Sequence, residues 1–330
     1  MAIFTMIAAN MAAYNYQEPH PFMFRLYGSF AAPTFVLLSG LLVPYSQQKQ
    51  TKSIGYFVKR GIFTLIIGAS LDFFVWRLIP FTSFDVLYVI GISLLINQLV
   101  HRINLWIHGI VSICIIALTP VAQSMFGYAD QPLEIMLDEG NAIENFSLGT
   151  ITKNFLLEGW FPMFPWLGIS MLGSFSGRFF FKMHTLKRER LFTSLGTMML
   201  IAGVSLWIIS NPNLLTRSGY SELFYPPKIC YLSSFLGLIF ILIGNIRRIV
   251  PEFLLQFFAV YGQSSLLMYI LHSCFIAYYF TPTFGTQNFY GFLQLYFVHA
   301  FILWWIAKFV QLLRPELRNT PFLIRFITGT

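Results

Sequence analysis

Residues 17–40 read QEPHPFMFRLYGSFAAPTFVLLSG, and this stretch decides the fold. It places His20 between two prolines, puts Arg25 one turn into an apolar run, and gathers small residues just before Pro33. The run can enter a bilayer as a helix, yet lipid alone does not tolerate polar groups of this kind. We therefore expect it to face protein or water inside a bundle of membrane helices.

The composition of the whole chain agrees with this class. Of its 330 residues, 56% are apolar and 10% are charged, and the mean hydropathy is +0.67. An ordinary soluble domain has about a quarter of its residues charged. The sequence thus predicts an all-α, polytopic membrane helix bundle, with residues 1–330 as a single transmembrane domain.

Apolar runs of about 20 residues, the length that crosses a hydrocarbon core of roughly 30 Å, divide the chain. Ten such segments are expected, the first as a membrane span and not a signal peptide. A polar segment, 124–158, follows the fifth. The expected spans lie near 1–14, 24–45, 59–79, 84–100, 104–123, 160–181, 191–209, 227–245, 260–281 and 289–312.

The basic residues orient these spans, because short cytoplasmic loops retain Lys and Arg. Sixteen of the 21 fall on one side of the expected membrane and five on the other. This split puts both termini in the cytoplasm and 124–158 outside. The net charge of +8 then reflects orientation, and no basic patch interleaved with aromatic residues suggests a nucleic-acid partner. We interpret the acidic residues of 124–158 as a solvated loop.

The three cysteines, Cys114, Cys230 and Cys274, lie in apolar runs without CxxC or Cys/His spacing. The sequence therefore suggests neither a disulfide framework nor a metal site.

Several polar residues lie at membrane depth and are candidates for a site. Asp72 falls in the outer half of the third expected span, where a carboxylate is costly without a partner, and Arg25 is the expected partner. An ion pair that only fixes packing is the structural alternative. Asp85 opens the fourth span, where it either complements the helix dipole or serves function. With His20, these residues are expected to converge on the outer half of the bundle.

The ninth expected span contains the second informative stretch, GQSSLLMYILH, residues 262–272. Ser265, Tyr269 and His272 are spaced by four and by three, so they share one helical face, which we predict to point inward. His272 is either a general base or a structural group bonded to a tyrosine or a backbone carbonyl.

Four blocks of the sequence together resemble a known family. RLYGSFAAPTFVLLSG, FDVLYVIGISLL, FPMFPWLGISMLGSFSGR and GQSSLLMYILH occur in the order seen in bacterial members of the heparan-alpha-glucosaminide N-acetyltransferase catalytic-domain family, within the broader transmembrane acyltransferase group. The resemblance implies that an acetyl group moves from cytoplasmic acetyl-CoA to an amine or hydroxyl of an extracytoplasmic sugar or envelope glycan. The expected location is the bacterial cytoplasmic membrane.

The resemblance also places the family's active histidine in the loop between the first two spans, which corresponds to His20. A histidine there can deprotonate the acceptor or itself take the acyl group, while Asp85 or Asp72 orients the imidazole and the acceptor. His272 is the other catalytic candidate. The binding candidates are Arg25, Ser29, Asp72, Ser265 and Tyr269, with acetyl-CoA as donor and no metal. Small residues around Ser29 suit either a thin pantetheine arm or tight helix packing.

Two other functional classes stay open. A transporter of a small or lipid-linked substrate would show broken helices at matching positions in two halves, and FPMFPW is the best candidate for such a break. A non-catalytic membrane subunit would tolerate replacement of its polar residues. The sequence leaves open whether the chain forms a homodimer.

Overall fold

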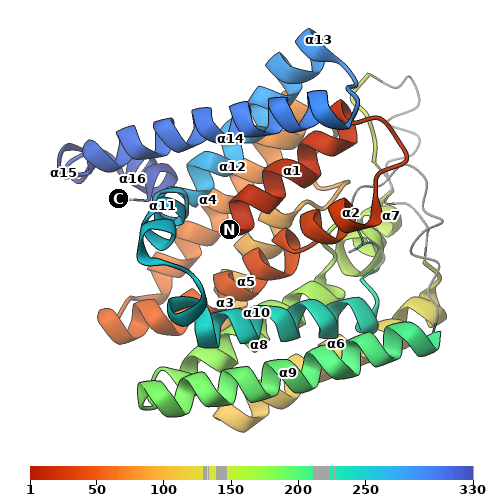
Figure 1. Ribbon diagram of the computed structural model, residues 1–330. Coiled ribbons are helices and arrows are strands. Elements are labelled where there is room, and N and C mark those ends of the chain that lie inside the picture. The colour runs from red at the N-terminus through yellow and green to blue at the C-terminus, as the bar shows by residue number, and fades with distance from the viewer. Residues whose placement is uncertain are drawn as a thin grey trace. The chain divides into compact units, whose positions relative to one another are not determined.

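The computed structural model of the chain describes residues 1–128, 132, 134–138, 147–210, 223, 225 and 227–329. Within these ranges every element of regular structure is a helix, and β-pairing is limited to two isolated bridges, Tyr16–Gln287 and Leu78–Met136 (Figure 1). The prediction of an all-helical protein is confirmed.

The helices follow the apolar runs closely. In chain order they are α1 (Ala2–Asn15), α2 (Phe22–Gly28), α3 (Ala31–Lys49), α4 (Ile54–Ser70), η1 (Leu71–Trp76), α5 (Val86–Val100), α6 (Leu105–Phe126), α7 (Leu148–Lys153), η2 (Asn154–Glu158), α8 (Met163–Phe180), α9 (Thr185–Ser210), α10 (Ile229–Ile249), α11 (Glu252–Gln263), α12 (Ser265–Phe275), η3 (Ile276–Phe280), α13 (Thr281–Phe284), α14 (Phe289–Leu312), α15 (Arg314–Leu317) and α16 (Phe322–Thr328). The elements labelled η are π-helical.

Each of the ten expected spans is helical, but fewer are complete membrane spans. Five helices of the described chain are long and apolar enough to cross a membrane, or seven if each of two bent pairs counts as one span. The expected count of about ten is not confirmed. α1 has 14 residues and α5 has 15, whereas a helix perpendicular to the bilayer needs about 20. The cytoplasmic location of both termini stays a prediction.

The chain divides into two compact units. The first unit comprises Met1–Ala31, Ser210–Leu223 and Asn245–Thr330, and the second comprises Ala32–Ile209 and Phe224–Gly244. The organisation into one transmembrane domain stays a prediction.

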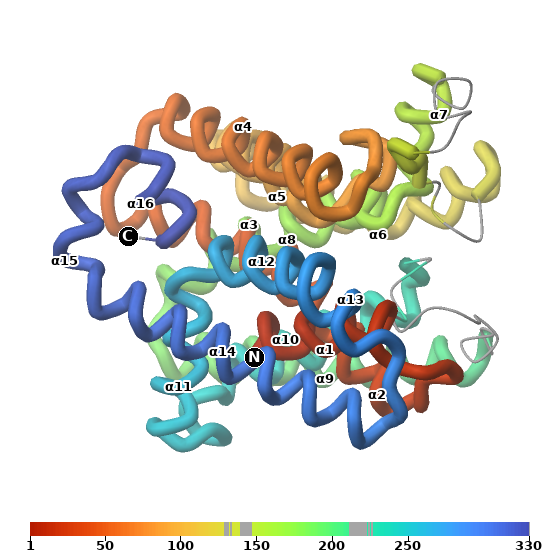
Figure 2. Tube along the Cα trace, turned by 90° about the horizontal axis from the view of Figure 1, so that it is seen from above, coloured from red at the N-terminus to blue at the C-terminus, as the bar shows by residue number. Residues whose placement is uncertain are grey.

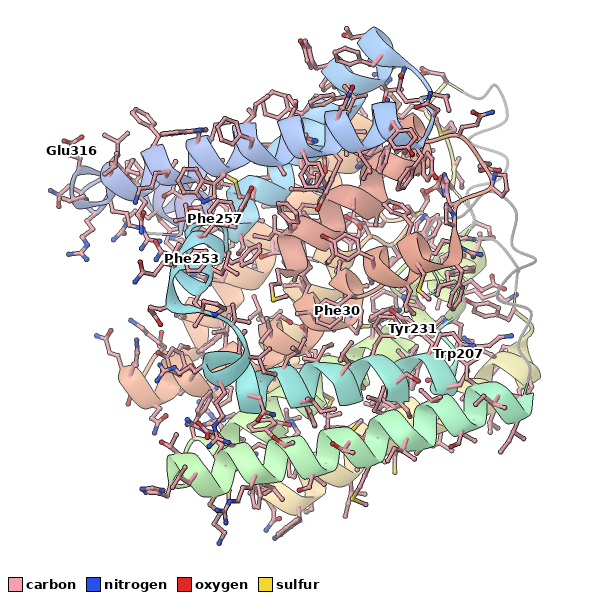
Figure 3. All side chains as sticks on the ribbon, viewed as in Figure 1. Phe30, Trp207, Tyr231, Phe253, Phe257 and Glu316 are labelled. Atoms are coloured by element: carbon pink, nitrogen blue, oxygen red, sulfur yellow. The ribbon has the colours of Figure 1, made fainter. Side chains whose placement is uncertain are left out.

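In the first unit, α1 packs against α2, α12 and α14, and α11 packs against α14 (Figure 2). α11 and α12 meet at Ser264 with a bend of 77°. Phe253 and Phe257, one turn apart on α11, are labelled in Figure 3, and the ring of Phe257 stacks on Trp304 at a centroid distance of 5.2 Å. Aromatic contacts thus fix α11 beside α14.

In the second unit, glycines allow neighbouring helices to approach closely. A Cβ on Gly61 of α4 would lie 2.7 Å from the carbonyl oxygen of Gly91 on α5, and a Cβ on Gly168 of α8 would lie 2.9 Å from Ser112 O on α6. Small residues at such crossings are typical of membrane helices, whose association depends on close van der Waals packing.

The outer faces of α6, α9 and α14 carry large apolar side chains that no other part of the described chain covers. Trp106 on α6 is 64% exposed, Ile208 on α9 is 75% exposed, and Phe301 on α14 is 61% exposed. Rows of such side chains on long helices need lipid around them. This is the arrangement of a multi-pass membrane protein.

Described residues of the polar segment 124–158 contact the connection between η1 and α5. Leu137 N donates to Arg77 O over 2.8 Å, and Arg77 forms a 3.0 Å ion pair with Asp138. Glu158 is buried and pairs with Lys153. The interpretation as a solvated acidic loop therefore fits Asp138 but is wrong for Glu158. Asp130, Glu139 and Glu144 lie outside the described residues.

Candidate functional site

His20 lies in the short connection between α1 and α2. α1 ends at Asn15, Tyr16 is extended, and α2 begins at Phe22, so the two flanking prolines leave the imidazole in irregular backbone between two helices. The ring Nε2 lies 3.1 Å from the carbonyl oxygen of Tyr16. The two rings also stack, with centroids 4.8 Å apart and planes 9° from parallel.

This contact assigns the tautomer of the neutral imidazole. A backbone carbonyl can only accept a hydrogen bond, so Nε2 carries the hydrogen and Nδ1 carries the lone pair. The side chain of His20 is half-buried. Nδ1 is therefore a basic and nucleophilic atom on a ring whose orientation is fixed by its neighbours.

An aromatic cluster from α2 and α14 surrounds the ring of Tyr16. Tyr16 stacks on Phe292 of α14 at 4.9 Å, and Phe24 of α2 meets Phe292 edge-on at 5.3 Å. Burial raises the pKa of the Tyr16 phenol. The Tyr16 phenol beside the imidazole is therefore uncharged at physiological pH.

His272 lies in a different setting, in the middle of α12. Its side chain is fully buried, its Nε2 lies 2.8 Å from Nδ2 of Asn10 on α1, and its Nδ1 lies 3.2 Å from Met268 O one turn earlier. Both ring nitrogens have partners, which is the geometry of a satisfied structural histidine.

The predicted inward face of α12 is confirmed for His272 and Tyr269, both of which are buried, and is wrong for Ser265. Ser265 is the first residue after the break at Ser264, so it lies at the helix end and is exposed.

The small residues of α2 pack tightly. A Cβ on Gly28 would lie 3.0 Å from Cβ of Ala9 on α1, so α1 and α2 are nearly in contact. Ser29 is fully buried, and its hydroxyl accepts a 2.5 Å hydrogen bond from Leu223 N. These contacts favour the packing interpretation of this patch.

In the second unit, Asp72 lies on η1 and is 1% exposed. The hydroxyl of Tyr88 on α5 donates to its carboxylate over 2.6 Å, and Ser83 Oγ lies 3.4 Å from both carboxylate oxygens. Arg25, which is buried on α2, belongs to the first unit, so its ion pair with Asp72 stays a prediction.

Asp85 takes the N-cap position of α5, as predicted for a helix start, but its side chain makes no capping hydrogen bond. The backbone before it turns through three non-glycine residues with positive φ, namely Arg77, Phe81 and Phe84. Asp85 is half-buried, and it interacts electrostatically with Asp72. The second unit therefore gathers at least three carboxylates, Asp72, Asp85 and Glu134, near one end of α5.

Sequence reasoning missed the residues that hold these groups. Tyr88 binds Asp72, Asn10 binds His272, and Asn15 binds the backbone before α14. Asn10 and Asn15 did carry a signal, since they are the two amide side chains in the apolar run 1–15. Tyr88 lies in an apolar stretch where a tyrosine needs no special explanation.

The chain matches a sequence profile described as heparan-alpha-glucosaminide N-acetyltransferase, catalytic, over residues 1–212. The match covers more than half of the chain. The chain belongs to this family. The resemblance predicted from the four sequence blocks is confirmed, and the family makes the protein a membrane acetyltransferase. A comparison with curated proteins found no match.

The matched range of this acetyltransferase family contains His20, Arg25, Ser29, Asp72 and Asp85, whereas Ser265, Tyr269 and His272 lie beyond it. The first unit thus combines a histidine from the matched range with supporting helices from the remainder of the chain.

Proposed function

We propose that this acetyltransferase moves an acetyl group from cytoplasmic acetyl-CoA to an amine or hydroxyl of a sugar or envelope glycan on the outer side of a bacterial cytoplasmic membrane. One observation carries the proposal. His20 is half-buried, its Nε2 binds Tyr16 O, and the lone pair of Nδ1 is thereby left for chemistry.

Two routes use this nitrogen. In direct transfer, Nδ1 takes the proton of the acceptor while the acceptor oxygen or nitrogen bonds to the thioester carbonyl carbon. The C–S bond then breaks, and the imidazolium returns the proton to the leaving thiolate of CoA. In the covalent route, Nδ1 bonds to the carbonyl carbon and the C–S bond breaks, which releases the CoA thiolate. The acceptor then bonds to the acetyl carbon as the N–C bond breaks, and its proton passes through the released imidazole to the thiolate.

The two carboxylates Asp72 and Asp85 of the second unit lie in different settings. Asp72 is almost fully buried and its carboxylate accepts from Tyr88 and Ser83. Asp85 is half-buried at the start of α5. We assign Asp72 to holding η1 against α5, and Asp85 stays proposed as a catalytic residue.

Two of the other candidates have contacts that support structural roles. Both nitrogens of His272 have partners, and Ser29 Oγ accepts from Leu223 N. Arg25 and Tyr269, both buried in the first unit, stay proposed as binding residues.

A transporter is the second candidate function, and one observation favours it. Each unit contains a bent pair of helical segments, Leu148–Glu158 with Met163–Phe180 at 45° and Glu252–Gln263 with Ser265–Phe284 at 77°. Discontinuous helices form the substrate sites of many transporters. The first of these bends falls between Glu158 and Met163, at the start of FPMFPW, the segment that the sequence offered as the best candidate for a break in a transporter.

A reconstitution experiment separates the two functions. Purified protein is placed in vesicles with ¹³C-acetyl-CoA on one side and a glycan extract of the cell envelope on the other, and the glycans are analysed by mass spectrometry. Appearance of ¹³C-acetyl groups on the glycans supports the proposal. Passage of an unmodified solute without any acetyl transfer would support the transporter instead.

Mass spectrometry of envelope glycans and lipids from cells with and without the gene identifies the acceptor. Loss of an acetyl mass from one glycan class would name the substrate. An unchanged acetylation pattern would contradict an envelope acceptor.

A further inference from the structure

We propose that Asn15 is a positioning residue, which acts through Tyr16 to hold His20 in the tautomer that leaves Nδ1 reactive. The inference rests on the proposed function of His20. It adds a group from the buried end of α1 and a partner from the connection before α14, neither of which the sequence singled out.

Asn15 is the last residue of α1, and its side chain is completely buried. Its amide Nδ2 donates a 2.9 Å hydrogen bond to Gly285 O, which is 270 residues away along the chain. A buried amide that makes this bond resists rotation, because breaking it would leave a carbonyl and an amide group unsatisfied in an apolar interior.

The same connection also holds the backbone on both sides of Tyr16. Gln287 N donates to Asn15 O over 3.0 Å, and Gln17 N donates to Gln287 O over 2.9 Å. Together with the Asn15 side chain, these bonds form a clamp of three hydrogen bonds. The residue between the two clamped positions is Tyr16, so its carbonyl and its ring both have a fixed direction.

Tyr16 transmits this order to His20. Its carbonyl oxygen accepts from Nε2 and its ring stacks on the imidazole, so it sets both the tautomer and the plane of the ring. If the carbonyl turned away, the imidazole would lose the bond that distinguishes its two nitrogens. It would then populate both tautomers and rotate about its Cβ–Cγ bond, and Nδ1 would be misplaced for part of the time.

Gly285 makes the clamp possible from the other side. Its φ of 57° and ψ of −152° lie in a region that residues with a side chain rarely adopt. This conformation presents the Gly285 carbonyl to Asn15. Open space surrounds the position where a Cβ would lie, so substitution there acts through the backbone and not through a steric clash.

The test compares five variants with the full chain. Asn15→Ala removes the donor, Asn15→Asp keeps the size of the side chain but replaces the donor with oxygen, and Gly285→Ala disturbs the acceptor. Asn288→Ala is the matched control, because Asn288 lies in the same connection and its Oδ1 caps α14 by accepting from Gly291 N. His20→Gln identifies the signals of His20 in ¹⁵N-histidine spectra.

We expect Asn15→Ala, Asn15→Asp and Gly285→Ala to lower kcat by about 10- to 100-fold. Displacement of a catalytic group by about 1 Å can lower the rate by about 100-fold. The KM for acetyl-CoA should change little. The ¹⁵N shifts of His20 should change from one tautomer to a mixture. Asn288→Ala should lower only the melting temperature. The ¹⁵N shifts of His20 report its positioning and the melting temperature reports stability, so these two measurements separate the two effects.

A wild-type kcat together with a single Nε2–H tautomer in any one of the folded clamp variants would overturn the inference. Should Asn15→Ala fail to fold, Asn15→Asp and Gly285→Ala decide the question, because they preserve the packing around position 15. If His20→Gln lost activity while the Asn15 variants kept normal activity, the positioning role of Asn15 would be refuted and the proposed function of His20 would stand. Full activity in His20→Gln would refute the proposed function itself.

Discussion

Two histidines of the first unit show how differently one side chain can be used. His20 lies between two helices, half-buried, with one ring nitrogen bonded to Tyr16 O. His272 lies within α12, fully buried, with both nitrogens bonded. Burial alone therefore does not separate the two roles that we propose for these histidines. They differ in whether the second ring nitrogen has a hydrogen-bond partner among the described residues.

The neighbouring helices explain the difference. Both histidines bond the carbonyl four residues earlier, Met268 O for His272 and Tyr16 O for His20. The packing of α1 against α12 brings Asn10 to the second nitrogen of His272. Within the described part of the chain, no hydrogen bond to the second nitrogen of His20 is formed.

Removal of the His20 imidazole should have the largest effect. His20→Ala is expected to lower acetyl transfer by about 10² to 10⁴, the usual loss when a general base is removed. Binding of acetyl-CoA and the melting temperature should change little, because the ring is half-buried and makes one local hydrogen bond. Near-normal transfer would move the catalytic role to Asp85 or His272.

Removal of the His272 imidazole should affect stability and not chemistry. His272→Phe is expected to lower the free energy of unfolding by about 1–3 kcal/mol, because Asn10 Nδ2 and Met268 O lose their buried partner. Turnover per folded molecule should stay normal. The control is His184→Phe at an exposed position, where we expect a change within about 0.5 kcal/mol.

Loss of turnover in His272→Phe at unchanged stability would reverse the comparison. His272 would then be a catalytic residue despite its two hydrogen bonds. Activity measured per folded molecule, with denaturant unfolding of the same sample, distinguishes the two results.

Single introduced cysteines should disturb the protein least, and they test on which side of the membrane each region lies. In a variant without its three cysteines, single cysteines are introduced at the exposed positions Glu18, Gln48 and Asp138 and labelled with a reagent that does not cross membranes. Glu18 and Asp138 should label in intact cells, and Gln48 should label only after lysis, because the basic residues place Gln48 in the cytoplasm. Equal labelling of all three in intact cells would contradict the predicted topology.

The membrane class, the family and the helical segments are all readable from the sequence. Apolar composition and runs of about 20 residues demand helices, because backbone groups in lipid must be satisfied within one segment. Even so, length alone misjudged the spans. α1 and α5 are apolar and helical but shorter than a perpendicular span, and the run 260–281 contains the break at Ser264.

His20 could be proposed as a catalytic residue from the sequence, because two prolines and a family pattern surround it. The ring nitrogen that the proposal uses could not be identified in this way. That assignment depends on the Tyr16 carbonyl and on the bonds of Asn15 and Gln287, which join positions about 270 residues apart. Likewise, the partners of Asp72 and His272 come from other helices. Sequence periodicity specifies which face of a helix is polar, but only packing decides which two faces meet. Packing therefore decides which lone pairs accept a hydrogen bond and which one the proposed reaction can use.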